Sequence, residues 1–200
     1  MTRMTSPGRP RDPDLERRVH VAACVVYGRN GWAGFSIDAV AREAAVGKAS
    51  IYLRWSDKRE LLVNALVDTL VQVGDVDTGS LRGDLIALAR HHLASYVGDL
   101  RDAALRMTTE APLTPDLRGP WETWREAQVR AARAVVRRGI ARGEIAHDSS
   151  VTLLLDALFG AALMHSLVTP DDLAAREALD VQEYATSLVD FVLSAVPTSP

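Results

Sequence analysis

The sequence predicts an all-α protein, with a small N-terminal domain of three helices joined to a larger helical domain. Apolar residues recur at spacings of three and four along most of the chain. No stretch combines sustained two-residue alternation with β-branched residues, which strands would require. With 200 residues and 48% hydrophobic content, the chain can form one or two domains with a real core.

The first twelve residues, MTRMTSPGRPRD, contain almost nothing apolar and carry Arg3, Arg9 and Arg11. Such a composition predicts disorder in the free protein. Two interpretations stay open: a basic arm that contacts phosphates or a minor groove, and a solvated tail.

A helix is expected from Asp14, a plausible N-cap, to about Asn30, with an end at Gly31. Its apolar stripe has the spacing of one helix face packed on neighbouring helices. The stripe contains Leu15, Val19, Ala22, Ala23 and Val26. Cys24 lies in the same run and is expected to be a buried, inert thiol.

The segment from Gly34 to Leu62 reads as a helix-turn-helix. A first short helix is expected at 37–44, a tight turn at 45–47 and a second short helix at 48–55. Ser36 stands at the N-cap position of the first of these helices. The apolar residues at helical spacing can close a small core, and they are Ile37, Val40, Ala41, Val46, Ile51 and Trp55.

The following helix is expected to begin after Asp57 and to run to about Val73. Asp57 can cap it, and Glu60 at the third helical position can complete a capping box. Further helices are expected at 81–96, 100–110, 115–142, 149–168 and 181–196, separated by Gly or Pro. The predicted divisions are an arm at 1–12, a helix-turn-helix domain at 13–60 and a second domain at 61–196.

The stretch AVGKASIYLRWSDKRELL resembles the signature of the TetR family of bacterial transcriptional regulators. A turn, a short helix with an internal aromatic residue, a closing aromatic residue and a basic residue opening the next helix follow in the family's order, and the match covers about residues 14–64. Two positions depart from the pattern: Gly47 replaces the common Ser, which weakens the helix cap, and Ala49 replaces the common Gly. The resemblance implies a homodimer that binds double-stranded DNA at a near-palindromic operator. It also implies a small-molecule effector in the second domain, most simply one that releases a repressor.

Seven residues are candidate DNA contacts. Lys48 and Tyr52 are four residues apart and therefore share one face of the second short helix. Lysine can reach guanine acceptors or a phosphate, and a tyrosine ring can contact a thymine methyl group. In the resemblance, Lys58 clamps the DNA backbone. The full set is Ser36, Lys48, Ala49, Ser50, Tyr52, Arg54 and Lys58.

The charge distribution along the chain supports DNA contact by the N-terminal part. The net charge is -3, yet Lys and Arg outnumber Asp and Glu in residues 1–62, and the reverse holds in the remainder. A basic end on an acidic body suits a protein that presents one end to phosphates, although solvated faces alone can also produce such an imbalance.

Aromatic, Met and His residues of the second domain are candidates for an effector pocket, and they suit an apolar or amphipathic ligand. They are His91, Tyr96, Met107, Trp121, Trp124, Phe159, Met164 and His165. The alternative is that they are ordinary core residues, because Trp and Met at helical spacing also fill cores.

The last two helices are expected to form the dimer surface. Residues 151–168 are apolar nearly all round, and 181–196 carry an apolar stripe. The alternative is that both are core helices of a monomer. Asp156 and His165 interrupt the first of them, which favours a buried helix over a membrane span.

Other functional classes find little support. No metal-binding or catalytic motif of known spacing appears, so neither an enzyme nor a metal or other cofactor is expected. The start of the chain lacks a secretory signal, and a cytoplasmic protein is expected. The main rival is a helical small-molecule-binding or interaction protein without sequence-specific DNA binding.

Overall fold

The computed structural model describes residues 14–69, 76–169 and 181–197, and over these residues the all-α prediction is confirmed. The helices are α1 (Leu15–Gly34), α2 (Ile37–Glu43), α3 (Lys48–Tyr52), α4 (Lys58–Thr69), α5 (Leu81–Ala94), α6 (Arg101–Thr109), α7 (Pro115–Ala141), α8 (Val151–Val168) and α10 (Val181–Ser194). Short 3-10 turns at Gly98–Leu100 and Ala111–Leu113 flank α6. The predicted arm at 1–12 and the predicted end of a helix at Val73 lie outside the described residues.

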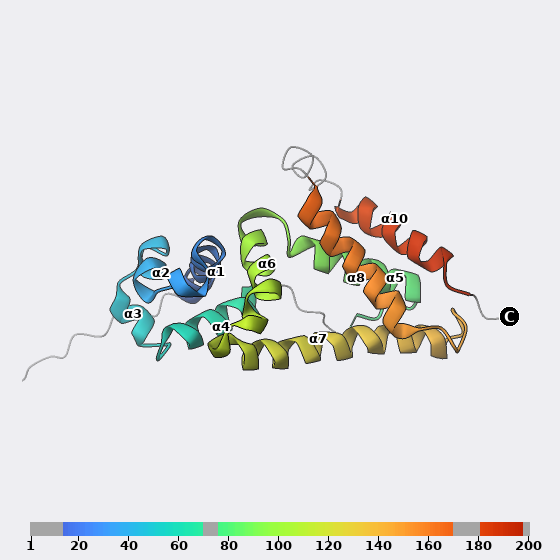
Figure 1. Ribbon diagram of the computed structural model, residues 1–200, viewed down its shortest axis with the longest axis horizontal. Helices are drawn as coiled ribbons and strands as arrows, with labels where there is room; N and C mark the ends of the chain where they lie inside the picture. The colour runs from blue at the N-terminus through green and yellow to red at the C-terminus, as the bar shows by residue number, and fades with distance from the viewer. Residues whose placement is uncertain (1–13, 70–75, 170–180, 198–200) are drawn as a thin grey trace, which may run out of the picture.

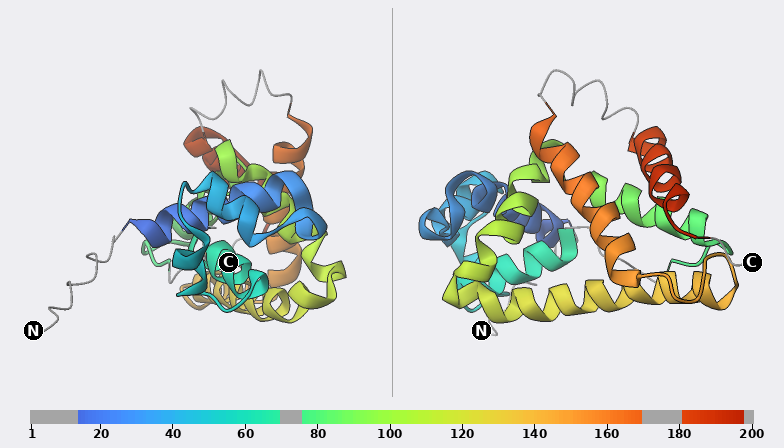
Figure 2. Two further views of the ribbon diagram at one scale, coloured as in Figure 1. Left: turned by 90° about the vertical axis from the view of Figure 1, so that its left-hand side faces the viewer. Right: turned by 45° about the vertical axis from the view of Figure 1, so that its right-hand side comes forward.

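The molecule is elongated, with two groups of helices at opposite ends (Figure 1). Helices α1 to α4, called the head below, gather at one end, and α5, α8 and α10 gather at the other. The long helix α7 runs beneath both groups, and α6 stands between α1 and α8 (Figures 1 and 2). The part of the chain from α5 onward is called the body.

Helix α1 forms the centre of the head. Val19, Ala23 and Cys24 are fully buried, which confirms the prediction for the cysteine, and burial raises the pKa of its thiol to about 12. Gly31 has a φ of 64° and interrupts the helix, as its position in the sequence predicted, but a last helical segment continues to Gly34. The predicted Asp14 cap is wrong, because the Asp14 backbone is itself helical and its side chain accepts no capping hydrogen bond; its carboxylate lies 3.9 Å from Nε of Arg17 instead.

The helix-turn-helix forms at the expected place. The Ser36 hydroxyl accepts a hydrogen bond from the Ala39 amide at 3.2 Å and so caps α2. Ala45 adopts the left-handed conformation, with a φ of 53°, which lets the chain reverse between α2 and α3. Gly47 precedes α3 without a side-chain cap, as its lack of a side chain requires.

Helix α3 ends at Tyr52, three residues before the predicted end. The Arg54 amide donates to the Ile51 carbonyl, a tighter turn than that of an α-helix, and the chain then carries Trp55 into the core. Asp57 caps α4 as predicted, by accepting from the Glu60 amide at 2.8 Å. The capping box closes differently from the prediction, because the Glu60 carboxylate accepts from the Ser56 amide and hydroxyl.

The buried residues form two clusters. One fills the head and continues through α4 into α6, the 3-10 turn after it and the first turn of α7, where Met107, Ala111 and Leu117 belong to it. The other lies among α5, α7, α8 and α10. The packing of the head therefore extends past residue 60, and the division predicted there stays a prediction.

Helix α8 is buried on one side only. Leu154, Leu155, Leu158 and Ala162 face the body's core, whereas apolar residues on other sides are exposed. The prediction of a buried helix is thus wrong for most of its surface in the single chain. By length and composition α8 is also apolar enough to cross a membrane, which for one helix is weak evidence of a span.

Candidate DNA-binding surface and internal cavity

Helix α3 presents an exposed face at the extremity of the head (Figure 1). Ile51 is fully buried and fixes the rotation of the helix, so that Lys48, Ala49 and Tyr52 lie on the solvent side. The Tyr52 side chain is 57% exposed, a large fraction for an aromatic residue. The structure thus places the predicted contact residues of α3 where a duplex can reach them, with Ser50 half-buried beside them.

The Lys48 amine is paired in the free protein. Its Nζ lies 2.6 Å from Oδ2 of Asp38 on α2, and both side chains are more than half exposed. An exposed pair of this kind contributes at most about 1 kcal/mol. A DNA phosphate or base can therefore replace Asp38 as the partner of Lys48 at small cost.

Two other predicted contacts also have local partners. The Arg54 guanidinium donates to the Ser50 carbonyl at 3.1 Å, which holds the side chain along α3. The Ser36 hydroxyl accepts from Ala39 as described, and its own proton remains available as a donor.

Lys58 is held more firmly than the sequence suggested. Its Nζ donates to the carbonyl oxygens of Trp32 and Phe35, both at 3.3 Å, and lies 4.0 Å from the centroid of the Trp32 ring. A cation at the C-terminal end of a helix satisfies the last carbonyls and interacts favourably with the helix dipole. Lys58 therefore stabilises the end of α1 in the free protein.

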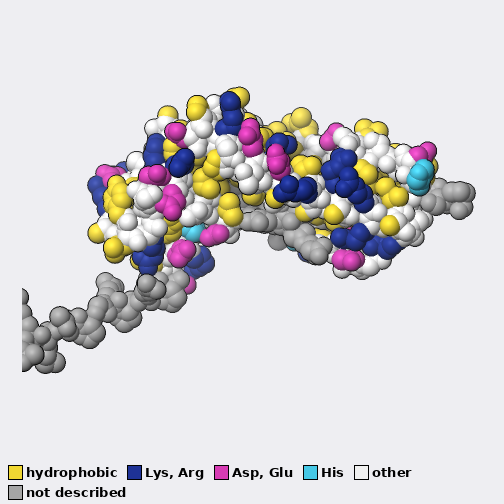
Figure 3. Space-filling view, turned by 90° about the horizontal axis from the view of Figure 1, so that it is seen from below, with side chains coloured by type: hydrophobic (Ala, Val, Ile, Leu, Met, Phe, Trp, Pro, Cys, Tyr) yellow, Lys and Arg dark blue, Asp and Glu magenta, His cyan; other side chains and the backbone are white. Residues whose placement is uncertain are grey.

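Charge on the face seen from below is mixed (Figure 3). Dark-blue basic and magenta acidic side chains are interspersed over the head, several basic side chains lie close together on the body, and hydrophobic side chains lie at the tip of the head. On this face charge does not single out a DNA-contacting region, so the candidate surface rests on the exposure of α3.

A cavity of about 570 Å³ lies within the body, close to the head. Helices α5, α6, α7 and α8 supply its walls. Six of the eight residues predicted to bind the effector line it, and they are His91, Tyr96, Met107, Trp121, Trp124 and Phe159.

Met164 and His165, the other two predicted effector contacts, do not line this cavity, and their role stays a prediction. The Met164 side chain is 56% exposed, and the His165 ring stacks on Tyr184 of α10 with centroids 3.8 Å apart. Phe159 and Leu163, one helical turn apart, are among the residues of α8 that line the cavity, and the two residues after Leu163 do not line it.

Sequence reasoning also missed several lining residues. They are His92, Ser95, Ala104, Thr108, Arg125, Gln128, Val129, Ala132, Arg133, Thr152, Leu155, Asp156, Gly160 and Leu163. A signal was present in α7, where positions 121, 124, 128 and 132 repeat at helical spacing and extend the two tryptophans into one stripe.

Three cavity-lining residues each carry a buried polar atom without a hydrogen-bond partner. These atoms are His91 Nδ1, His92 Nε2 and Trp124 Nε1. The His92 ring packs against Tyr96 and Phe159 with centroids 5.1 and 4.9 Å away, and burial lowers the pKa of His92 to about 4. The His92 imidazole is therefore neutral at physiological pH. The cavity wall thus presents three buried nitrogen atoms whose hydrogen bonds are not made.

Helix α6 connects the cavity to the head. Ala104, Met107 and Thr108 line the cavity, while Arg106 on another side of the helix donates from Nε to the Gly28 carbonyl of α1 at 2.7 Å. A Cβ atom at Gly28 would lie only 2.9 Å from the Ala103 amide nitrogen, so the two helices are in close contact.

One residue beyond α6 extends this connection. Glu110 accepts from the Trp32 amide at 3.0 Å, directly after the interruption of α1 at Gly31. A displacement of α6 by a ligand would therefore act on α1 at two points.

Comparisons with known proteins agree with this arrangement. Residues 21–65 match the family model for bacterial regulatory proteins of the tetR family, and residues 75–192 match that for the tetracyclin repressor-like C-terminal domain. The HTH-type transcriptional regulator YdeS of Bacillus subtilis (strain 168) is 27% identical over 171 residues, which cover 82% of this chain and 84% of the relative. The DNA-binding transcriptional repressor TetR of Mycobacteroides abscessus is 48% identical over 61 residues, which cover 30% of this chain and 32% of the relative.

Among solved structures, GusR of Salmonella enterica is similar with a TM-score of 0.70 at 15% identity, covering 92% of this chain and 97% of that chain. This likeness extends the shared fold to nearly the whole length. Since the C-terminal family model alone spans more than half of the sequence, the chain belongs to the TetR family of DNA-binding transcriptional regulators.

Proposed function

We propose that this regulator is a repressor that binds a near-palindromic operator as a homodimer and leaves it when an apolar or amphipathic molecule fills the body cavity. The observation that carries the proposal is the position of α6, which lines the cavity with Met107 and bonds to α1 through Arg106. A protein that acts on chromosomal DNA works in the cytoplasm, and the proposed role requires no catalysis.

On DNA, α3 enters the major groove. Lys48 exchanges Asp38 for a base or phosphate, Ala49 meets the groove through its methyl group, and Tyr52 contacts a thymine methyl or a phosphate. Ser50 lies on α3 and Arg54 in the turn that follows it, while Ser36 and Lys58 approach the backbone from the neighbouring helix starts. When Lys58 contacts a DNA phosphate, its amine must either keep its hydrogen bonds to the Trp32 and Phe35 carbonyls or give up one of them.

The homodimer surface lies on α8 and α10. These helices expose large apolar side chains, among them Phe191 with 76% of its surface exposed. The exposed set is Leu153, Met164, Leu167, Val168 and Phe191. Covering them with a second copy removes apolar area from water and fixes the distance between the two α3 helices.

The lining of the cavity indicates the effector's chemistry. Aromatic rings from Tyr96, Trp121, Trp124 and Phe159 favour a flat or aliphatic body, and neutral His92 adds no charge. Polar groups of Arg125, Arg133 and Asp156 also line the cavity and suit one polar substituent on the ligand. A small rotation of a histidine ring would let that substituent bond to a nitrogen that now lacks a partner.

Release requires that the effector prefers a conformation in which the two heads no longer fit successive major grooves. In the operator complex these heads must lie about 34–36 Å apart along the duplex. A ligand that pushes Met107 would shift α6, and with it α1, away from that spacing.

The first experiment selects source-genome fragments on the purified protein near physiological salt and sequences those retained. We expect one or a few near-palindromic sites. The double variant Lys48→Ala, Tyr52→Ala should then lose about 100-fold or more in operator affinity at unchanged thermal stability. Arg130→Ala, an exposed cation on α7, is the matched control. Retention without sequence preference, or full affinity in the double variant, would contradict the assignment.

A second experiment tests the cavity with a paired glycine substitution. A Cβ atom at Gly160, which lines the cavity, meets nothing within 4 Å, and the same is true of Gly119 on α7, which does not line it. Gly160→Leu should weaken binding of the apolar dye 1-anilinonaphthalene-8-sulfonate several-fold, whereas Gly119→Leu should leave it unchanged. Equal dye binding by both variants would place the ligand elsewhere.

A further inference from the structure

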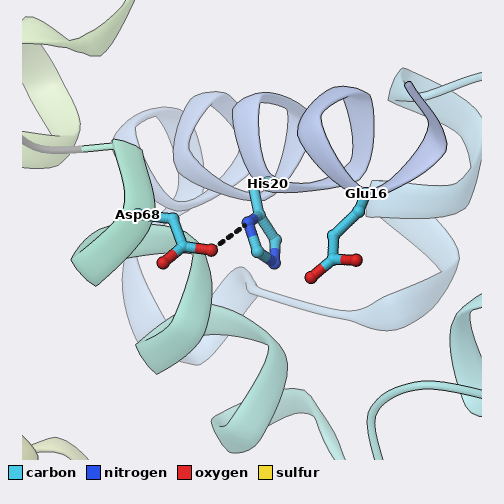
Figure 4. Close-up of side chains that lie close together, drawn as sticks. All are labelled: Glu16, His20 and Asp68. Atoms are coloured by element: carbon cyan, nitrogen blue, oxygen red, sulfur yellow. Dashed lines mark ion pairs between the residues drawn. The ribbon is translucent and has the colours of Figure 1, made fainter. Parts of the chain in front are cut away.

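Three potential metal ligands meet where α1 packs on α4 (Figure 4). Glu16 and His20 lie one helical turn apart on α1, and Asp68 projects from α4 toward them. One ligand atom from each residue lies within 4.8 Å of the other two. None of the three belongs to the effector cavity.

His20 distinguishes this cluster from a group of surface carboxylates. The residue is only 4% exposed, and its Nδ1 lies 3.1 Å from Oδ2 of Asp68. The other ring nitrogen, Nε2, is buried and has no hydrogen-bond partner, and it lies on the side of the ring that faces Glu16 (Figure 4). A buried polar atom without a partner requires an explanation, and a bound ion is one of the few available.

We propose that Glu16, His20 and Asp68 form a binding site for a divalent transition-metal cation of the Zn²⁺ class. An imidazole nitrogen together with carboxylate oxygens suits Zn²⁺, whereas Mg²⁺ and Ca²⁺ prefer oxygen ligands alone. Zn²⁺ binds such atoms at about 2.0–2.2 Å, so the ligand atoms of a tetrahedral ion are about 3.4 Å apart. Side-chain rotations that move the ligand atoms by about an ångström bring them to that separation.

Two arrangements of the ligands share this chemistry. Asp68 either binds the ion directly or keeps its hydrogen bond to Nδ1 and orients the ring, while Nε2 and Glu16 bind the metal. The Glu16 and Asp68 side chains are exposed, so water can complete the coordination shell.

An ion bound at this cluster would also affect the stability of the head, an effect separate from the proposed effector response. Asp68 is the penultimate residue of α4, and the His20 ring lies against Trp55 with centroids 5.3 Å apart. An ion here cross-links α1 to the far end of α4, next to the tryptophan that follows the recognition helix α3. Binding should therefore stabilise the head in the conformation described above.

The test uses the full untagged chain and Zn²⁺ as the probe. Calorimetric titration should give one ion per chain, and thermal unfolding should move to higher temperature with Zn²⁺ and far less with Mg²⁺. Glu16→Gln and Asp68→Asn alter exposed side chains and leave the fold intact, and each should weaken Zn²⁺ binding by tenfold or more. His147→Gln, which removes an exposed histidine of the body, is the matched control and should bind like the unaltered protein.

A spectroscopic measurement tests the two carboxylate ligands independently of calorimetry. Co²⁺ in place of Zn²⁺ should give visible absorption bands that Glu16→Gln and Asp68→Asn change and His147→Gln does not. Two outcomes would overturn the proposal: no binding or thermal shift at millimolar Zn²⁺, or binding that only His147→Gln reduces. Both are independent of operator binding and dye binding, so the site can fail while the proposed function stands.

Discussion

The head and the body bury aromatic rings in different ways. In the head, Phe35 stacks on Trp32 and meets Tyr27 edge-on, inside a core that closes around it. In the body, Phe159 packs on His92 but also borders an open cavity of about 570 Å³. Close packing in the head holds α3 in one position. Incomplete packing in the body leaves space in which a bound ligand can displace the surrounding helices. One chain thus combines a closely packed head with a body that contains a cavity.

The strongest test of this difference is one substitution made in each region. Phe35→Ala should lower the free energy of unfolding by about 3–5 kcal/mol, because it opens a cavity in a closed core. Phe159→Ala should cost only about 1–2 kcal/mol, because one side of its ring already faces open space. Denaturant unfolding of both variants measures the contrast. Equal losses would mean that the body is as tightly packed around Phe159 as the head is around Phe35.

The next test concerns His92, one of two cavity histidines that have a ring nitrogen without a hydrogen-bond partner. Burial lowers the pKa of His92 to about 4, so between pH 6.5 and that value the unfolded chain binds a proton that the folded chain does not. Stability contributed by the neutral ring is present above pH 6.5 and is lost as pH falls, by about 3 kcal/mol in total.

His92→Phe keeps a ring in contact with Tyr96 and Phe159 and cannot titrate. We expect it to lose less stability on acidification, which unfolding curves at pH 7 and pH 4.5 will reveal. His147→Gln should retain the full loss, since that histidine is exposed. An unchanged acid response in His92→Phe would refute the role of this ring.

A smaller effect separates two lysines of the head. Lys58→Gln should reduce stability by about 1–2 kcal/mol, because it removes the cation bonded to the Trp32 and Phe35 carbonyls. Lys48→Gln should change stability by less than about 0.5 kcal/mol but weaken operator binding. Parallel unfolding and DNA titrations distinguish them, and the salt dependence of affinity reports whether Lys58 also neutralises a phosphate.

The smallest effect is expected in the turn before α3. Ala45 has a positive φ, which costs a residue with a Cβ atom about 1 kcal/mol relative to glycine. Ala45→Gly should therefore stabilise the protein by roughly 0.5 kcal/mol, because added freedom in the unfolded chain offsets part of that gain. Ala44→Gly, next to it in the right-handed helical region, should destabilise instead. Thermal unfolding will show the two opposite signs.

Local sequence determined most of the head. Ser36, the turn at 45–47 and Asp57 act through hydrogen bonds to residues three to five positions away, so their spacing sufficed to place α2, α3 and α4. The same spacing put Ile51 inside and Lys48 and Tyr52 outside. Helix ends were less predictable, because Trp55 left the helical path for a long-range contact with the core.

Only the tertiary structure decided what the aromatic and charged residues of the body and of the helix junctions do. Composition could not separate Phe159, which borders the cavity, from His165, which stacks on Tyr184, because the rotation of α8 depends on its neighbours. Nor could it bring Lys58 to the end of α1 or Asp68 to His20, since those contacts join residues 23 to 48 positions apart. Periodicity fixes which residues share a face, but the partner of that face is set by packing between helices that are distant in the sequence.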